Sequence, residues 1–320
     1  MSAYLPPPTI ALVVPCYDEE ACIEETVATL IGVLDGLVAA ENIAAGSFLF
    51  LVDDGSRDRT WELIRAARER DRRVRGLRLS RNFGHQNALL AGLLRTGELC
   101  DAAISIDADL QQDPAAIPEF VEAYRRGAEV VLGVRDDRRA DGWFKRNTAR
   151  AFYRLMSLMG VPLVPDHADY RLLGRRALAA LAEYRESNLF LRAICLQLGF
   201  RQARVNFAVR ARQAGESKYT LAKMLRLAVH GITSTSTVPL RLVALTGFFV
   251  FMFSTVMAGY VLYVALMTPR AIPGWASTAL PIYFLGGIQL LCLGVVGEYI
   301  GQIIDEVKRR PRFHGVDELS

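Results

Sequence analysis

The chain has 320 residues, enough for one large domain or two smaller ones, and a net charge of +4, too small to indicate nucleic-acid binding. Hydrophobic residues make up 52% of it, and their excess lies after residue 240, which indicates a soluble part followed by a membrane part. The 5 cysteines are scattered without CxxC spacing, so the sequence predicts neither a disulfide framework nor a zinc site and favours a reducing compartment. Met1–Thr9 is short, uncharged and proline-rich, so no signal peptide is expected there.

Strands and helices are predicted to alternate through the first part of the chain. Short apolar runs predict strands at Ile10–Val14, Phe48–Val52, Val74–Leu79, Ala102–Ile106, Glu129–Gly133 and Arg204–Arg210. Helices are expected at Ala21–Ala39, from near Thr60 behind a cap at Asp58 or Ser56, and at Asn87–Thr96, Ala177–Tyr184 and Asn188–Leu198. This alternation predicts βαβ units and the α/β fold class, with a mostly parallel, Rossmann-like sheet.

Polar clusters follow four of the predicted strands. They are Tyr17–Glu19, Asp53–Ser56, Arg81–Gln86 and Asp107–Gln111. Ligands of such sheets bind at the carboxyl ends of the strands, so the four clusters are expected to meet at one edge and form an active site. The G-x-G-x-x-G and Walker signatures are absent, which argues against dinucleotide binding and P-loop chemistry.

One of these clusters carries a pair of carboxylates, Asp107 and Asp109, spaced i, i+2 after an apolar run. Hard divalent cations such as Mg²⁺ and Mn²⁺ take oxygen ligands, usually a few carboxylates together with substrate phosphates. Acidic pairs at strand ends are also common as turn or helix-cap residues. The pair alone leaves both interpretations open, and the convergence of the four clusters favours a metal that holds a nucleotide diphosphate.

Two long uncharged runs lie near the end of the chain. Leu242–Leu266 has 25 residues and Ala276–Gly297 has 22, and each is long enough to cross a hydrocarbon core of about 30 Å. Basic residues flank the pair on both outer sides, at Lys218, Lys223, Arg226 and Arg241 and again at Lys308, Arg309, Arg310 and Arg312. The positive-inside rule therefore predicts two transmembrane helices with both termini in the cytoplasm.

These patterns predict four segments. Residues 1–219 are expected to form a cytoplasmic catalytic domain, and residues 220–239 amphipathic juxtamembrane helices, because Leu221–Val229 has Lys223 and Arg226 on one face. Residues 240–305 are expected to hold the two membrane helices, at about 242–266 and 276–300. Residues 306–320 are expected to be a basic cytoplasmic tail. Glu298 lies at the inner end of the second run, where either a functional role or simple snorkelling fits.

In the order and spacing of these motifs and in its two predicted membrane helices, the chain resembles a family 2, GT-A-fold polyprenyl-phosphate glycosyltransferase. It is most similar to the bactoprenol glucosyltransferases, and dolichyl-phosphate mannose synthase is a more distant relative. The matching segments run nearly end to end: Val14–Glu20, Asp53–Ser56, Ser80–Gln86, Asp107–Gln111, Ala168–Leu172, Ala214–Tyr219, Pro239–Arg241 and Gly297–Gly301. The chain departs from the family pattern at Asp18, where Asn is usual, and at Asp113 before Pro114.

The resemblance implies roles for particular residues. Pro15, Tyr17, Glu19 and Asp54 would hold the nucleoside. Asp107, Asp109 and Gln111 would hold Mg²⁺ or Mn²⁺ on the diphosphate, and Arg135 would neutralise phosphate charge. Arg212, Ser217 and Lys218 would belong to a loop that closes over the site near the lipid phosphate. Asp169 is offered by the family pattern as a catalytic base.

The implied reaction is inverting transfer of a sugar from a nucleotide diphosphate to polyisoprenyl phosphate at a bacterial inner membrane. The second pKa of a phosphate monoester is about 6, so the acceptor is mostly ionised at neutral pH and needs little deprotonation. We therefore expect Asp169 to orient the acceptor or sugar, or to pair with Arg171 or a loop cation; a structural Asp at a helix start is the alternative. Glucose from UDP-glucose is the first donor to expect, ahead of GDP-mannose, UDP-galactose and an amino-arabinose donor, and the family suggests a homo-oligomer, a tetramer.

Two other functions stay open at this point. A processive family 2 polysaccharide synthase usually carries more membrane helices and a Q-x-x-R-W motif, which this chain lacks. A non-catalytic membrane scaffold with a degenerate transferase domain would be expected to lose the acidic pair, which is intact here.

Overall fold

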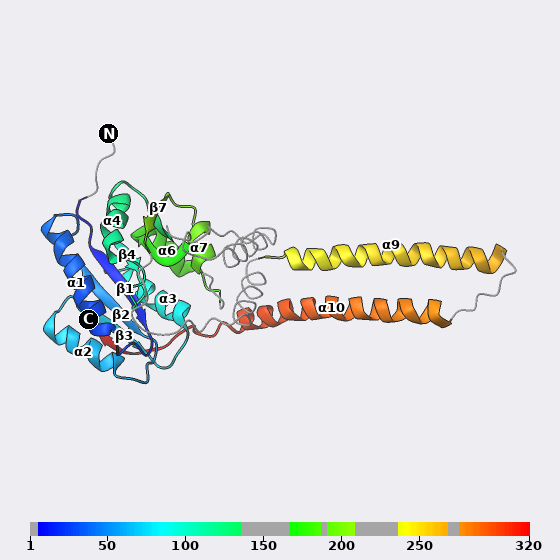
Figure 1. The fold of residues 1–320 in the computed structure, drawn as a ribbon, viewed down its shortest axis with the longest axis horizontal. Coiled ribbons are helices and arrows are strands. Elements are labelled where there is room, and N and C mark those ends of the chain that lie inside the picture. Colours follow the sequence, from blue (N-terminus) through cyan, green and yellow to red (C-terminus); the bar gives the residue numbers. More distant parts are fainter. Residues whose placement is uncertain (1–5, 136–166, 187–190, 209–235, 268–274) are drawn as a thin grey trace. The chain divides into compact units, whose positions relative to one another are not determined.

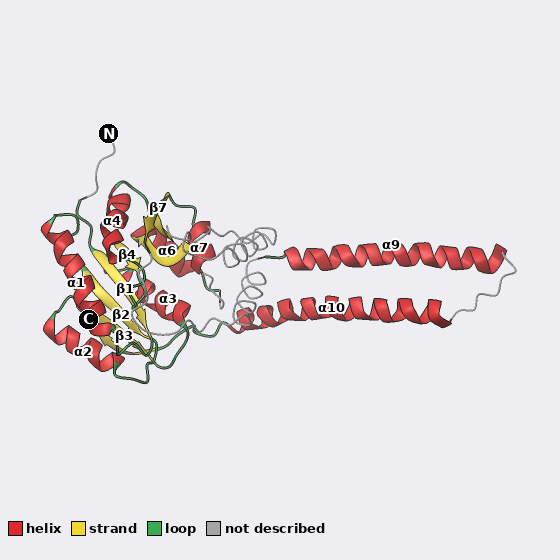
Figure 2. Cartoon of the chain, in the orientation of Figure 1, coloured by secondary structure: helices red, strands yellow, loops and turns green. Residues whose placement is uncertain are grey.

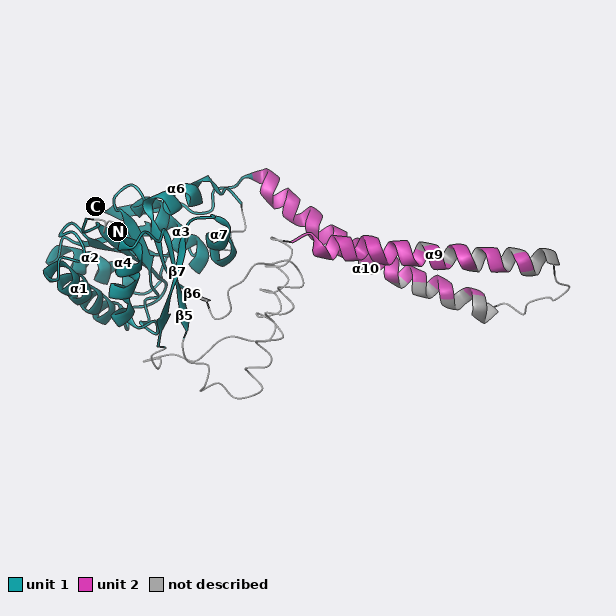
Figure 3. Cartoon of the chain, turned by 90° about the horizontal axis from the view of Figure 1, so that it is seen from above, with its two compact units in different colours: residues 1–154, 162–219, 309–320 teal, residues 155–161, 220–308 magenta. Residues whose placement is uncertain are grey.

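A computed structural model describes residues 6–135, 167–186, 191–208, 236–267 and 275–320. It divides into two compact units (Figure 3). The first comprises Met1–Arg154, Pro162–Tyr219 and Arg309–Ser320, and the second comprises Leu155–Val161 and Thr220–Lys308. Each unit is described by itself.

In the described part of the first unit, eight strands form one mixed sheet (Figure 1). In spatial order they are β7 (Gln202–Phe207), β5 (Val130–Arg135), β6 (His167–Gly174), β4 (Ala102–Ser105), β1 (Ile10–Cys16), β2 (Phe48–Asp53), β3 (Val74–Leu79) and β8 (Gly315–Leu319). β4, β1, β2 and β3 run parallel, which brings their carboxyl ends to one edge. β6 is antiparallel to both of its neighbours, and β8 is antiparallel to β3.

Helices cover both faces of this sheet (Figure 2). Buried side chains of α1 (Ile23–Ala39), α2 (Thr60–Arg70) and α4 (Ile117–Arg125) belong to one core cluster, and those of α3 (His85–Thr96), α6 (Arg175–Glu183) and α7 (Leu191–Gln197) belong to the other. β1 supplies both clusters alternately, because successive side chains of a strand point to opposite faces. Leu12 lies in the first cluster and Val13 in the second. A short 3₁₀ turn, Pro114–Ala116, precedes α4.

The sequence-based prediction of the first five strands is confirmed, with ends that differ by at most two residues. The strand predicted at Arg204–Arg210 is described at Gln202–Phe207, two residues earlier at its start. β6 was not predicted, because its sequence carries Asp169 and Arg171 where an apolar run is expected. Asp169 therefore lies in a central strand, and the alternative that placed it at a helix start is wrong.

The C-terminal segment also differs from its prediction. Residues 306–320 were expected to form a basic tail, but α10 continues to Lys308 and Gly315–Leu319 forms β8 at the edge of the catalytic sheet. The basic residues at Lys308, Arg309, Arg310 and Arg312 predicted a tail, and the strand after them was not predicted. The catalytic domain therefore includes the last residues of the chain.

The second unit contains two long helices, α9 (Val238–Met267) and α10 (Trp275–Lys308), which run side by side (Figures 1 and 3). Many of their large apolar side chains are exposed, among them Phe249, Phe253, Leu290 and Leu293. Among the described residues, one helical segment is long and apolar enough to cross a membrane, Ile288–Lys308, and Val238–Val250 is a shorter apolar one. The two predicted spans are thus not both confirmed. The predicted juxtamembrane helices lie almost wholly outside the described residues.

Candidate active site

The loops after β1 and β2 are joined by hydrogen bonds at the carboxyl edge of the sheet. The backbone N–H of Asp18 donates to Ser56 Oγ at 3.0 Å, and that of Glu19 donates to Thr60 Oγ1 at 2.9 Å. Asp18 has a φ of 53°, a left-handed conformation in which Asn and Asp are enriched, so the Asp that stands in place of the family's Asn fits the backbone. Its carboxylate accepts the Arg57 N–H at 2.8 Å.

Three of the expected nucleoside-binding residues lie on or beside this joined pair of loops. Pro15 is buried in β1, opposite Val52 of β2. Tyr17 is exposed at 37% of its surface and is open to a ligand. Glu19 is half-buried, and its carboxylate accepts the Cys22 thiol at 3.0 Å.

Asp54, the fourth expected nucleoside-binding residue, makes structural hydrogen bonds within the chain. Its carboxylate accepts the backbone N–H groups of Phe83 at 2.7 Å and Gly84 at 2.9 Å, so it anchors the loop that follows β3. Burial raises the pKa of Asp54, while these two hydrogen bonds lower it. We therefore expect Asp54 to act on a bound nucleotide through this loop.

Gly55 lies against the same loop, with a φ of 68° and no room for a side chain. A Cβ there would lie 2.5 Å from the carbonyl carbon of Arg81, closer than van der Waals contact allows. Gly55→Ala is expected to lower the free energy of unfolding by about 1–3 kcal/mol, through the positive φ and the clash together. Thermal unfolding of the full chain in detergent measures this loss.

The matched control for Gly55→Ala is Gly36→Ala. Gly36 lies in the exposed face of α1 with nothing within 4 Å of an added Cβ. The same chemical change there is expected to stabilise the chain by up to about 1 kcal/mol, because Ala is the better helix former. Equal melting temperatures for the two variants would contradict the close approach of Gly55 to the loop.

The acidic pair lies on the turn directly after β4. The backbone N–H of Ile106 donates to the Val13 carbonyl at 3.1 Å, which fixes where the turn begins. The side chain of Gln112, 2% exposed, holds Asp107 from both sides: its Nε2 donates to Asp107 Oδ2 at 2.6 Å, and its Oε1 accepts the Asp107 N–H at 3.0 Å. Asp109 Oδ1 accepts the Gln111 backbone N–H at 3.2 Å. Gln112 was missed by the sequence analysis, which favoured its neighbour Gln111.

β6 brings Asp169 to this turn. β4 and β6 are antiparallel with Ser105 opposite Arg171, so the residues just before Arg171 lie beside those just after Ser105. His85 Nε2 lies between the two acids, 3.6 Å from Asp107 Oδ1 and 3.8 Å from Asp169 Oδ2. Gln86 Nε2 donates to Asp169 Oδ2 at 3.3 Å. The start of α3, directly after the loop that follows β3, therefore joins the site through His85 and Gln86.

Two arginines neutralise Asp169. Arg171, fully buried in β6, pairs with Asp169 Oδ1, and Arg192 of α7 pairs with Oδ2 at 2.9 Å. Burial alone would raise the pKa of Asp169, but Arg171 and Arg192 hold it well below its usual range. Asp169 is therefore ionised at neutral pH and is a poor proton acceptor. The expected pairing of Asp169 with Arg171 is present, and Arg192 is a partner that no sequence pattern indicated.

The acidic pair suits a hard cation. Burial raises the pKa of Asp107 to about 6, His85 lowers it, and the charges of Asp169 and Asp109 raise it again. A divalent cation beside Asp107 and Asp109 would offset the cost of this negative charge. Among the described residues no three His, Cys, Asp or Glu side chains are grouped as a complete metal site. Two carboxylates completed by phosphate oxygens and water match the way Mg²⁺ is usually bound.

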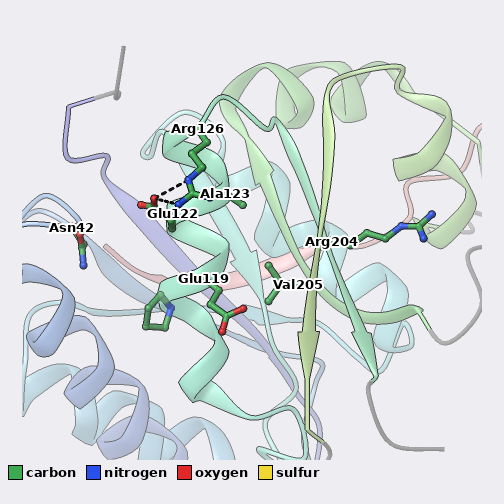
Figure 4. A pocket seen from close by; sticks show the side chains of 8 residues that line it. Asn42, Glu119, Glu122, Ala123, Arg126, Arg204 and Val205 are labelled. Atoms are coloured by element: carbon green, nitrogen blue, oxygen red, sulfur yellow. Dashed lines mark hydrogen bonds and ion pairs between the residues drawn. The ribbon is translucent and has the colours of Figure 1, made fainter. Parts of the chain in front are cut away.

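The other predicted site residues are not brought to this edge by described contacts. Arg135 is exposed at the end of β5. Arg212, Ser217 and Lys218 lie outside the described residues. A separate pocket lies by α4 and β7, lined among others by Glu119, Glu122, Arg126 and Arg204 (Figure 4). None of its lining residues belongs to the four polar clusters, and the Glu122–Arg126 ion pair lies at its wall.

The chain is similar in sequence to known glycosyltransferases. The profile of Glycosyl transferase family 2 matches residues 11–181. The chain is 47% identical over 306 residues to YkoT, an uncharacterized glycosyltransferase of Bacillus subtilis, with 96% of this chain and 90% of that protein covered. It is 38% identical over 266 residues to the SfII prophage-derived bactoprenol glucosyl transferase of Shigella flexneri, covering 83% of this chain and 85% of the relative. A crystal structure of mannosyl-3-phosphoglycerate synthase from Rubrobacter xylanophilus matches with a TM-score of 0.47 and 15% identity, over 83% of this chain and 78% of that one.

The chain belongs to glycosyl transferase family 2, and it is a glycosyltransferase. Its sequence similarity to the bactoprenol glucosyl transferase extends well beyond the matched family domain, over most of both chains. The expected family resemblance is confirmed.

Proposed function

We propose that the enzyme transfers a hexose, first of all glucose from UDP-glucose, to undecaprenyl phosphate at the cytoplasmic face of a bacterial inner membrane. The observation that carries this proposal is the cluster at the carboxyl edge of the sheet, in which Asp107 faces His85 and, on the neighbouring strand β6, the arginine-neutralised Asp169. The name of the Shigella relative supports the lipid acceptor and the glucosyl group. The 47% identical relative carries no substrate in its name.

Asp107, Asp109 and Gln111 are the residues that would hold Mg²⁺ or Mn²⁺ against the donor diphosphate. The metal would neutralise charge on the departing nucleoside diphosphate. Gln112 orients Asp107 by donating to its carboxylate and accepting its backbone N–H, so that the ligand is in place before the donor arrives. Tyr17, exposed beside β1, would offer a ring to the nucleoside, and Pro15 and Glu19 are the other residues proposed to hold it.

The acceptor phosphate attacks the anomeric carbon from the side opposite the leaving group, so the configuration inverts. Because this phosphate is mostly ionised at neutral pH, no strong base is needed. The pairing of Asp169 with Arg171 and Arg192 supports a positioning role, since a carboxylate held ionised by two cations takes up protons poorly. Arg135 and the loop with Arg212, Ser217 and Lys218 would supply positive charge for the phosphates.

For the membrane part we propose two spans, at about 242–266 and 276–300, with both termini in the cytoplasm. The exposed apolar side chains on α9 and α10 support lipid contact, because soluble proteins rarely expose so much contiguous apolar surface. Such an arrangement would keep the catalytic domain at the surface where a lipid acceptor presents its phosphate. A homo-oligomer, a tetramer by family resemblance, belongs to the same proposal.

The test is a donor panel on the purified full chain in detergent. UDP-glucose, GDP-mannose, UDP-galactose and UDP-amino-arabinose are each offered with undecaprenyl phosphate and Mn²⁺, with and without a chelator. We expect lipid-linked product from UDP-glucose, inversion at the anomeric carbon seen by NMR, and loss of product on chelation. Product from another donor alone would replace glucose in the proposal. Nucleotide binding without transfer to any lipid phosphate would contradict the acceptor.

A further inference from the structure

The last residues of the chain pack against the sheet of the catalytic domain. We call residues 312–320 the C-terminal clasp. Its strand β8 pairs antiparallel with β3, with Leu319 opposite Gly76, Glu318 opposite Leu77 and Asp317 opposite Arg78. β3 would otherwise be the edge of the sheet, where backbone groups are left without partners.

Side chains fasten the clasp at several points. Phe313 packs against the core cluster on one face of the sheet, and Leu319 packs against the cluster on the other face. Glu318 pairs with Arg95 of α3 at 2.7 Å, and Arg312 donates to the Tyr184 carbonyl at the end of α6. A tail that only happened to lie near the sheet would not reach both core clusters.

The clasp also contacts the loop that reaches the active site. The Ser80 N–H donates to the His314 carbonyl at 2.9 Å, and the His314 ring lies 6.2 Å from the Phe83 ring. On its inner side the same loop is fixed by Asp54, which accepts the N–H groups of Phe83 and Gly84. Residues 80–86, which are this loop and the first two residues of α3, are therefore held between Asp54 and the clasp.

The first two residues of α3, at the end of this segment, face the carboxylates of the candidate active site. His85 lies within 4 Å of both Asp107 and Asp169, and Gln86 donates to Asp169. We propose that the clasp is a positioning element of the active site: it fixes residues 80–86 so that His85 and Gln86 stay aligned on Asp107 and Asp169. A displacement of about 1 Å in such groups lowers turnover by up to about 100-fold.

The first test compares the full chain with a variant that ends at residue 311. Amide hydrogen exchange at Phe83 and Gly84 is expected to become at least about 10-fold faster in the truncated chain, because the loop loses its contacts with the clasp. The turnover number for Mn²⁺-dependent transfer from UDP-glucose is expected to fall about 10- to 100-fold, with little change in KM for the donor. A synthetic peptide of residues 309–320, added in excess, should restore both readouts, and a scrambled peptide should restore neither.

Point variants keep the inference testable if the truncated chain does not fold. Phe313→Ala removes the side chain that packs the clasp against a core cluster. It is expected to speed amide hydrogen exchange at residues 80–86 and to lower the turnover number. Val316→Ala is the matched control, because Val316 is 58% exposed and its truncation should change neither readout. Unchanged exchange and turnover in Phe313→Ala would overturn the inference, as would equal effects of the two variants.

The activity readout rests on the proposed function, but the exchange readout does not. If UDP-glucose is the wrong donor, no variant transfers glucose, while exchange at Phe83 and Gly84 still separates Phe313→Ala from Val316→Ala. If the clasp has no positioning role, transfer proceeds and exchange is the same in both variants. The two failures are therefore distinguishable.

Discussion

Asp169→Asn is expected to lower the free energy of unfolding by about 3–5 kcal/mol, because it leaves the fully buried Arg171 without its carboxylate partner. The Arg171 Nε already has no hydrogen-bond partner among the described residues, so little else can compensate the charge. A loss of that size is a large share of the 5–15 kcal/mol that typically stabilises a folded protein. Chemical denaturation of the full chain in detergent, followed by intrinsic fluorescence, measures it.

The matched control is Asp35→Asn. Asp35 also pairs with an arginine, Arg73 at 2.5 Å, but its side chain is 59% exposed. The same amide-for-carboxylate change is expected to cost less than about 1 kcal/mol there, since exposed ion pairs contribute little. Similar losses in the two variants would contradict the burial argument for the Asp169–Arg171 pair.

A double variant separates the structural from the catalytic role of Asp169. Asp169→Asn with Arg171→Met removes the buried charge together with its partner and is expected to regain most of the lost stability. Transfer should stay low in this variant, because His85, Gln86 and Arg192 have lost the carboxylate they contact. Full recovery of transfer with stability would show that Asp169 acts only through folding.

The pH dependence of this pair has a definite sign. The pKa of Asp169 is lowered in the folded state, so the stability that the carboxylate contributes is present above its unfolded pKa of about 3.9 and is lost as pH falls further. The stability difference between the wild type and Asp169→Asn should therefore be constant between pH 6 and 8. A difference that shrank across this range would indicate that Asp169 titrates there.

Asp107→Asn is expected to lower transfer by about 10³-fold, on the scale of the several kcal/mol that a catalytic metal supplies in the transition state. The stability of the metal-free protein should not be lowered by this substitution. Burial raises the pKa of Asp107 to about 6, above the unfolded value of about 3.9, so the ionised carboxylate costs stability at pH 7. The variant is therefore expected to be at least as stable as the wild type at pH 7, with an advantage that shrinks as pH falls from 6 toward 4.

Binding of Mn²⁺ gives the second readout for Asp107→Asn. Mn²⁺ with UDP is expected to raise the melting temperature of the wild type and to leave that of the variant nearly unchanged. Glu119→Gln removes the same charge from the exposed start of α4 and should behave like the wild type in both assays. Transfer by Asp107→Asn within a few-fold of the wild type would contradict its role as a metal ligand.

The sequence predicted the parallel core of the domain because each strand there is an apolar run followed by a polar loop. β6 could not be found this way, since a buried ion pair replaces apolar residues within it, and such a pair is visible only once Asp169 and Arg171 are placed together. Arg192 and Gln112 were missed for a related reason. Their roles depend on contacts with Asp169 and Asp107 from a separate helix and from a buried turn, and no local pattern encodes either contact.

The edge of the sheet was predicted as a meeting point because the carboxyl ends of parallel strands converge there, and the described contacts among His85, Asp107 and Asp169 confirm that residues far apart in the chain meet at this edge. β8 was not predicted, because its own composition resembles that of a solvated tail. It forms a strand because it pairs with the free edge of β3, which is far from it in the sequence.

We propose that the sheet edge carrying Asp107 transfers a sugar from a nucleotide donor to a lipid phosphate. Its most direct test is incorporation of labelled glucose from UDP-glucose into undecaprenyl phosphate, measured side by side for the wild type and Asp107→Asn in the same detergent with Mn²⁺. We expect labelled lipid from the wild type and almost none from the variant, at equal amounts of folded protein. Equal labelling by the two proteins would contradict it.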